Sequence, residues 1–310
     1  MAHGTQSLGV AALLGLIAVA AAVPKHKDSR VPLLPAKILR RPPRTARLDT
    51  ASRQLNGAAA LLALAALTDS AVEHYRGSFH NKTMYVPLGA ATATLLASLR
   101  DTIAPGAADR SERAVVDALA VATGIIGTGF HLYNVGKRPS GFSWLNLFYS
   151  APLGAPASLS LAGLLRRMAL LVRTRAMVAG MLPGKALAWL VSLGLLGTSA
   201  EAALLHFRGA YHNPAMVIPV TAPPLAAGLL VGASADSSRS HPLTRWALRL
   251  VAGAGFLGSA FHAYGVSRNM GGWRNWSQNI LNGPPLPAPP AFTALAIAGL
   301  AALSLIERRR

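Results

Sequence analysis

Cysteine is absent from this chain of 310 residues. Its absence excludes disulfides, thiolate metal sites, iron–sulfur clusters and covalently attached c-type haem. Charge is also scarce: Asp, Glu, Lys and Arg together make up 13% of the residues, against about 25% in a typical soluble domain. A chain with so few charges lacks the polar surface that a soluble fold needs.

Acidic residues are the scarcest charged group, with 11 Asp and Glu beside 30 Lys and Arg, and the formal net charge is +19. A strongly basic chain can bind nucleic acid through basic arms interleaved with aromatic residues. Here the basic residues instead gather between apolar runs, where the positive-inside rule places them in a membrane protein. We therefore expect a lipid bilayer, and no nucleic acid, as a partner of this chain.

Hydrophobic residues make up 52% of the chain and stand in long runs rather than in amphipathic stripes. Crossing a bilayer takes about 20 mostly apolar residues, so the sequence predicts an all-α integral membrane protein with about nine transmembrane helices. Arg166 and Arg167 shorten the fifth span, and we expect the basic residues after them to lie at the membrane surface. The predicted spans are 8–23, 55–75, 84–99, 114–134, 147–165, 186–207, 215–233, 246–265 and 290–306.

The basic residues predict the orientation of the spans. Loops that alternate along the chain carry 23 Lys and Arg on one side and seven on the other, and the richer side is expected to be cytoplasmic. The N-terminus is then outside and the basic C-terminal tail inside a plasma membrane of the bacterial, inner-membrane type. Residues 1–23 could instead be a signal peptide, but they have no basic residues before the apolar run, which favours a retained helix.

The chain also contains an internal repeat. The segment HYRGSFHNKTMYVPL at 74–88 matches HFRGAYHNPAMVIPV at 206–220. Further along, GIIGTGFHLYNV at 124–135 matches GFLGSAFHAYGV at 255–266. Each copy falls within four predicted spans. Because four is even, two tandem units of this kind share one orientation and are related by a pseudo-two-fold axis along the membrane normal.

These patterns divide the chain into five parts. Residues 1–23 form the N-terminal helix, and residues 24–54 form a basic cytoplasmic linker. The first four-helix repeat covers 55–165, and a basic cytoplasmic or interfacial connector covers 166–185. The second repeat, with its basic tail, covers 186–310.

Histidines gather at one membrane face in this topology. Four of them end outward-running spans and two lie in the short outer loops, whereas His26 and His241 are expected in cytoplasmic loops and His3 in the N-terminal tail. Ionisable residues at membrane depth are costly and indicate function, although a histidine at a helix C-terminus can also serve only the helix dipole. The six outer histidines are His74, His80, His131, His206, His212 and His262.

The first functional hypothesis is a b-type haem in each repeat. His74 would pair with His131, and His206 with His262, as axial ligands. Gly124 and Gly127 precede His131 on the same helical face, as Gly255 and Gly258 precede His262. Such faces could lie bare beneath a porphyrin, although small residues at this spacing also serve close helix packing. Arg76 and Arg208 follow ligands by two residues and could pair with propionates.

The second hypothesis is a non-haem site for Cu, Zn or Fe, which imidazole and carboxylate ligands suit. Its candidate ligands are the six outer histidines together with Asp69 and Glu201, which occupy equivalent positions in the two repeats. An offset of five residues turns each acid away from the histidine that follows it on the same helix. In the repeated segment, we expect the chain to turn out of the helix at Gly77, in a left-handed conformation. His80 and His212 would then cover the site or orient its ligands.

The sequence therefore leaves three functions open. The favoured one is a haem-binding electron-transfer or membrane-anchor subunit of a respiratory oxidoreductase, with a dehydrogenase and a quinone as partners. The second is a transporter or metal-handling protein that uses the same histidines and carboxylates. The third is a structural membrane protein without a cofactor. The common nucleophile, phosphate-loop and zinc-protease motifs are absent from the sequence.

Overall fold

The structure of this protein is a computed structural model that describes residues 44–104, 110–174 and 176–307. The predicted first span, 8–23, lies outside the described residues. Within them the chain is helical, apart from turns and one isolated bridge between Val178 and Met181. The helices are α2 (Arg44–Arg76), α3 (Val86–Ile103), α4 (Arg110–Gly136), α5 (Trp144–Tyr149), α6 (Gly154–Thr174), α7 (Pro183–Arg208), α8 (Ile218–Ala235), α9 (Pro242–Arg268), α10 (Trp276–Asn282) and α11 (Pro290–Ile306), with 3-10 turns η1 (Lys82–Tyr85), η2 (Pro214–Val217) and η3 (Gly272–Asn275).

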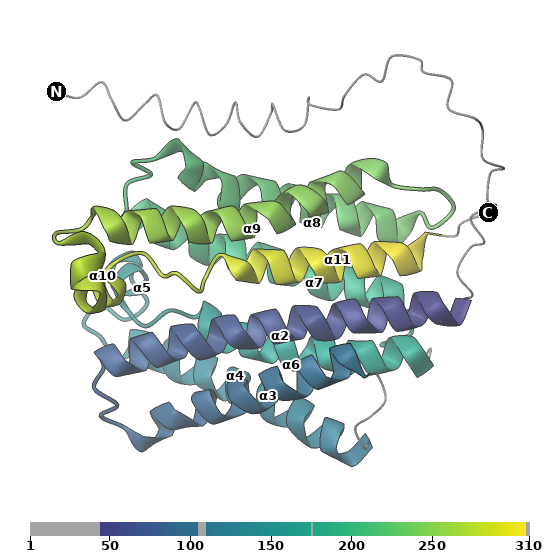
Figure 1. Ribbon diagram of the computed structural model, residues 1–310, viewed down its shortest axis with the longest axis horizontal. Coiled ribbons are helices and arrows are strands. Elements are labelled where there is room, and N and C mark those ends of the chain that lie inside the picture. The colour runs from purple at the N-terminus through teal and green to yellow at the C-terminus, as the bar shows by residue number, and fades with distance from the viewer. Residues whose placement is uncertain (1–43, 105–109, 175, 308–310) are drawn as a thin grey trace.

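Four helices form the centre of the bundle. α11 packs against both α2 and α7, and α2 and α7 also contact α6. On one side α3 and α4 pack against α2 and α6, and on the other α8 and α9 pack against α7 and α11. The short helices α5 and α10 lie together at one end of the bundle (Figure 1). Both therefore mark the same end, at which α2, α4, α7 and α9 finish.

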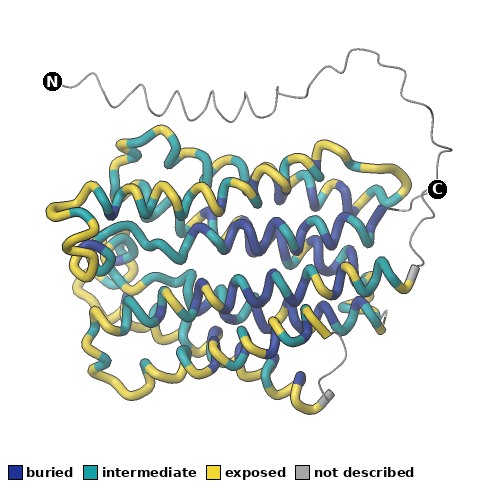
Figure 2. Tube along the Cα trace, viewed as in Figure 1, coloured by how far each residue is buried: buried dark blue, intermediate teal, exposed yellow. Residues whose placement is uncertain are grey.

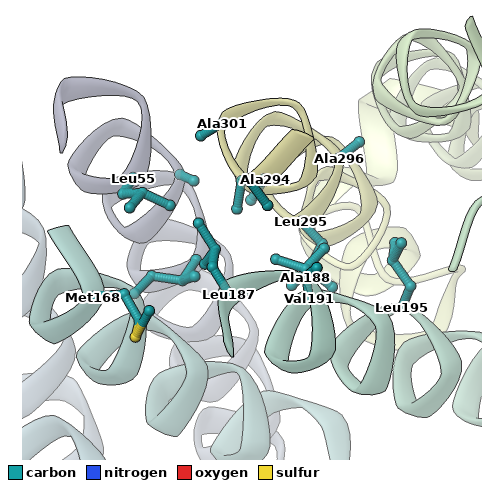
Figure 3. Close-up of a cluster of buried hydrophobic side chains, with 14 of the residues drawn as sticks. Leu55, Met168, Leu187, Ala188, Val191, Leu195, Ala294, Leu295, Ala296 and Ala301 are labelled. Carbon is teal, nitrogen blue, oxygen red and sulfur yellow. The ribbon is translucent and has the colours of Figure 1, made fainter. Parts of the chain in front are cut away.

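Small apolar residues build the core where the central helices meet (Figure 3). α11 is buried along most of its length, and Ala294, Ala298 and Ala302 are completely inaccessible. A Cβ atom on Gly194 of α7 would lie 2.9 Å from the side chain of Leu295, so the two helices need a glycine here to come this close. Close backbone approach through small residues is how helices pack within membranes.

Burial decreases sharply from the central helices to the outer ones (Figure 2). The outward faces are apolar all the same: Ile125, Phe130 and Leu225 expose more than half of their surface. A soluble monomer rarely exposes contiguous apolar surface on this scale. The outer faces thus fit contact with lipid.

The spans agree with the predictions in part. Five helices in the described residues are long and apolar enough to cross a membrane: α2, α4, α6, α7 and the segment 214–235 that ends with α8. α3 and α9 carry no span by the same measure, and α11 is an apolar helix of only 17 residues. The predicted count of nine spans stays a prediction.

Two helices extend beyond the predicted boundaries. The basic linker was placed at 24–54, but α2 already begins at Arg44, and its 33 residues measure about 50 Å, well beyond the roughly 30 Å of a hydrocarbon core. Its early turns are held by the core, because Ala51 and Leu55 are buried. The fifth span was placed at 147–165, yet α6 runs on to Thr174 through Arg166, whose charge is paired inside the bundle.

Candidate functional site

His74 and His206 end α2 and α7 in the same way. The Nδ1 atom of His74 lies 2.6 Å from the carbonyl oxygen of Met84, and the Nδ1 atom of His206 lies 2.8 Å from that of Met216. A carbonyl oxygen only accepts hydrogen bonds, so each imidazole donates from Nδ1. This bond closes the tight turn that leads into the next helix and leaves Nε2 as the acceptor nitrogen.

His131 and His262 occur within the last turns of α4 and α9 and make a matching pair of bonds. Their Nδ1 atoms lie 2.5 Å from the oxygen of Pro152 and 2.6 Å from that of Pro285. Each bond ties the end of a helix to the loop that precedes α6 or α11. All four helix histidines therefore have one imidazole nitrogen fixed by the backbone, the arrangement that also fixes a metal-binding histidine.

The structure brings these histidines together in two pairs. His74 and His131 are near enough to interact electrostatically, and so are His206 and His262. No group of three or more His, Cys, Asp or Glu side chains that could hold a metal ion occurs among residues 44–104, 110–174 and 176–307. The non-haem metal site stays a prediction.

The bare glycine faces predicted for a porphyrin are not bare. A Cβ atom on Gly124 would lie 2.2 Å from Oγ of Ser160, and one on Gly127 would lie 3.1 Å from Cβ of Pro156. The first two turns of α6 cover this face of α4. Glycines at this spacing are equally suited to close helix packing, which accounts for both of them here.

The second repeat shows the same covering. A Cβ atom on Gly255 would lie 2.2 Å from Oγ1 of Thr293, and one on Gly258 would lie 2.8 Å from Cβ of Pro289. The hydroxyl of Thr293 also donates to the carbonyl oxygen of Ala252 at 2.7 Å. These glycines serve the α9–α11 contact.

The turn in the repeated phrase differs from the prediction as well. Gly77 was expected to adopt the left-handed conformation, but Ser78 and Phe79 adopt it instead, with φ of 56° and 45°. Gly77 has another reason to be glycine, since a Cβ atom there would lie 3.1 Å from the methyl group of Met84. His80 is exposed and its Nδ1 lies 3.0 Å from the oxygen of Gly77; His212 does the same with Gly209.

The two arginines predicted to hold propionates have other partners. Arg76 pairs with Glu73 at 3.0 Å. Arg208 donates to the carbonyl oxygen of Phe148 in α5 at 3.1 Å and stands over the ring of Tyr149. The second arginine therefore joins the two halves of the bundle.

Asp69 and Glu201 lie where the two halves meet. Glu201 of α7 accepts a hydrogen bond of 2.8 Å from the backbone N–H of Gly154, at the start of α6. A Cβ atom on Gly154 would collide with the Glu201 carboxylate, so this contact needs glycine. Asp69 of α2 interacts electrostatically with Glu73 and with Glu201. The two acids thus lie within electrostatic range of each other across the bundle.

Sequence analysis also missed a buried network of charges at the opposite end. Arg166 of α6 is 3% exposed and lies 2.7 Å from Asp117 of α4 and 3.3 Å from Asp101 of α3. Arg113 reaches the same Asp101 at 3.1 Å. The signal was available, because charges within apolar segments face the bundle interior and pair with one another, but Arg113 and Arg166 were assigned to the cytoplasmic side and the two acids were given no role.

These observations define a class: an all-helical protein with several helices that are apolar enough for a bilayer, and with paired histidines at one end of the bundle. No protein-family model matches the chain, and neither a curated protein nor a solved structure does. Function is therefore inferred from the site alone.

Proposed function

We propose that the chain is a tandem duplication of a four-helix membrane unit. Support comes from bonds that recur at equivalent positions, such as His74 to Met84 and His206 to Met216. The side-chain amide of Asn146 donates to the carbonyl oxygen of Gly141, and at the equivalent position Asn279 donates to that of Gly272. The proposed first unit holds α2 to α6 and the second holds α7 to α11.

The favoured function builds on this duplication: the chain would be an electron-transfer or anchor subunit of a respiratory oxidoreductase, with one b-type haem in each unit. The main support is that a backbone carbonyl holds the Nδ1 atom of each of the four helix histidines. The two Nε2 atoms of each pair would then be free to bind a metal. In each unit the pair stands on diagonal helices: α2 and α4 both pack on α3 and α6, and α7 and α9 both pack on α8 and α11. A flat cofactor between two axial imidazoles requires facing helices of this kind.

The residues fit a haem in ligand chemistry and limit its position. Four imidazoles in two pairs match two six-coordinate haems without any cysteine. Pro156 and Pro289 pack against Gly127 and Gly258, so a porphyrin would not lie against these glycines. Arg76 and Arg208 would have to leave Glu73 and Phe148 to reach propionates.

Haem bound in this way would supply one-electron transfer. The chain's own residues orient the ligands, because the Nδ1–H groups donate hydrogen bonds to the carbonyl oxygens of Met84, Pro152, Met216 and Pro285. These bonds keep each imidazole in the tautomer that could bind a metal through Nε2. A dehydrogenase and a quinone in the membrane would be its electron-transfer partners. In the proposed orientation the histidine end faces outward from a bacterial inner membrane, with the C-terminus in the cytoplasm.

An absorption spectrum of the detergent-purified protein tests this function. We expect a Soret band and a reduced α-band of six-coordinate b haem, at two haems per chain. His131→Ala should remove about half of the signal, because each haem needs both axial imidazoles. The double variant His131→Ala with His262→Ala should remove nearly all of it.

Matched controls are the exposed loop histidines. His80→Ala and His212→Ala remove an imidazole that bonds only within its own turn, so the amount of haem should stay unchanged. A colourless protein that takes up no haem on reconstitution would refute the proposal, and a protein whose haem survives loss of all four helix histidines would refute the ligand assignment.

One observation favours the second candidate, a transporter or metal-handling protein. Asp69 and Glu201 come from different proposed units and interact across the boundary between them, and transporters built from repeats place ion sites at such boundaries. Stoichiometric Zn or Cu in a colourless preparation, lost in Asp69→Asn but not in Glu112→Gln, would support this function. Glu112 is a suitable control because it lies half exposed near the opposite end of the bundle.

A further inference from the structure

The turn between α2 and η1 contains an unusual conformation. Phe79 has a φ of 45°, and its counterpart Tyr211 has a φ of 46°. The left-handed region is disfavoured for residues with a Cβ atom, and for a bulky side chain it is a genuine outlier. Glycine and asparagine adopt it with least strain, yet both copies of the turn place an aromatic residue there.

The turn itself does not need an aromatic ring. Its backbone bonds are the same in both copies: the N–H of Phe79 donates to the oxygen of His74 at 3.0 Å, and that of Tyr211 donates to the oxygen of His206 at 3.1 Å. A glycine would make these bonds with less strain. Strain that persists at a site indicates that the strained side chain has a role there.

Each ring meets the same imidazole edge to face. The ring of Phe79 lies 6.2 Å from that of His74 at 82°, and the ring of Tyr211 lies 6.1 Å from that of His206 at 83°. Aromatic pairs prefer this perpendicular geometry. The aromatic residue is itself held, since Phe79 stacks on Tyr85 at 4.4 Å and the hydroxyl of Tyr211 donates to Ala203.

Two contacts therefore fix each imidazole. The Nδ1 bond to Met84 or Met216 fixes one edge of the ring, but a single hydrogen bond still allows the ring to rock about it. The perpendicular aromatic ring restricts this movement, so the imidazole keeps one orientation and its Nε2 atom points in one direction. A ligand held to within about 0.5 Å by neighbours of fixed rotamer binds its metal best.

We propose that Phe79 and Tyr211 are positioning residues that aim Nε2 of His74 and His206 at the bound group, at the expense of a strained turn. This role rests on the proposed function, because the group aimed at is the haem iron. The orientation of the imidazoles does not depend on haem and can be measured without it. Nitrogen-15 NMR of histidine-labelled protein reports the tautomer of each ring.

The experiment compares three variants of the full-length protein in detergent, without haem and after reconstitution with haem b. Phe79→Gly keeps the turn and removes the ring, Phe79→Leu keeps bulk without an aromatic face, and Phe79→Tyr installs the residue that the second copy uses. Unit two is unchanged in each, so the signals of His206 and His262 report within the same sample that the bundle is folded.

In the wild type we expect His74 to be in the Nδ1–H tautomer. Without the aromatic ring the imidazole of His74 can rock and its Nδ1 bond to Met84 weakens, so Phe79→Gly and Phe79→Leu should mix the tautomers of His74. They should also weaken haem binding in unit one by about 10-fold and shift its reduction potential, whereas Phe79→Tyr should keep the tautomer, the affinity and the potential of the wild type. A wild-type tautomer and potential in both Phe79→Gly and Phe79→Leu would overturn the role. If the tautomer changes but no variant or wild type binds haem, the positioning holds and the haem proposal fails.

Discussion

Replacing Arg166 should destabilise this protein more than any surface ion pair can. Its guanidinium is 3% exposed and bonds to Asp117 at 2.7 Å, Asp101 at 3.3 Å and Ser98 at 3.4 Å. Asp101 keeps Arg113 when Arg166 is lost, but Asp117 then has no other ion-pair partner in the described residues. A buried charge left without its partner costs about 3–5 kcal/mol, so Arg166→Gly should lower the free energy of unfolding by at least that much.

The second half of the chain supplies the matched comparison. If the units are equivalent as proposed, Leu248 and Gly299 stand where Asp117 and Arg166 stand, and a Cβ atom on Gly299 would lie 2.8 Å from Leu248. The double variant Asp117→Leu with Arg166→Gly builds this apolar pair. Because replacing both partners of a buried pair is often near neutral, and glycine in a helix costs about 1 kcal/mol, the double variant should be more stable than either single variant.

The assay is an unfolding titration of the purified protein from mild detergent into SDS, followed by far-ultraviolet circular dichroism. Arg173→Leu serves as the control, because Arg173 and Asp49 form a partly exposed pair that should contribute less than about 1 kcal/mol. Additive losses in the double variant, or a loss of under about 1 kcal/mol for Arg166→Gly, would refute the interpretation of the network as a coupled, buried set of charges.

Three further predictions concern other parts of the molecule. Gly124→Val should lower the free energy of unfolding by about 1–3 kcal/mol or more in the same titration, because its Cβ would collide with Ser160; an unchanged stability would show that α4 and α6 do not meet here. Reporter fusions should place the turns at 76–83 and 208–214 on one side of the membrane and residues 236–241 on the other, and turns found on opposite sides would refute the parallel units. The pKa of Asp236 is lowered to about 2 by the Ser238 hydroxyl and backbone N–H and by Arg239, so its stabilisation of the α8–α9 turn is complete above the usual carboxyl pKa of about 4, declines as the pH falls below that value and is lost at about pH 2; protection of the Ser238 amide that does not fall between about pH 4 and pH 2 would contradict this.

Much of the fold could be predicted from the sequence because few backbone structures can cross a bilayer. Backbone groups in lipid must bond within their own segment, so a long apolar run such as 290–306 predicts a helix, and α11 covers those residues. The repeated phrase could be located from its letters, and the matched positions of His74 and His206 followed. Their common end of the bundle follows because each predicted repeat has four spans, an even number.

Which face of a helix meets which neighbour was decided by the tertiary structure. Gly124 and Gly127 line one face of α4 in any helix, but only packing determines that α6, and not a cofactor, covers that face. The same holds for Arg166: its charge indicated a membrane surface, whereas the approach of Asp101 and Asp117 from two other helices made a buried position possible. Contacts between residues 49 and 65 positions apart leave no periodic signal in the sequence, because they depend on how three helices assemble.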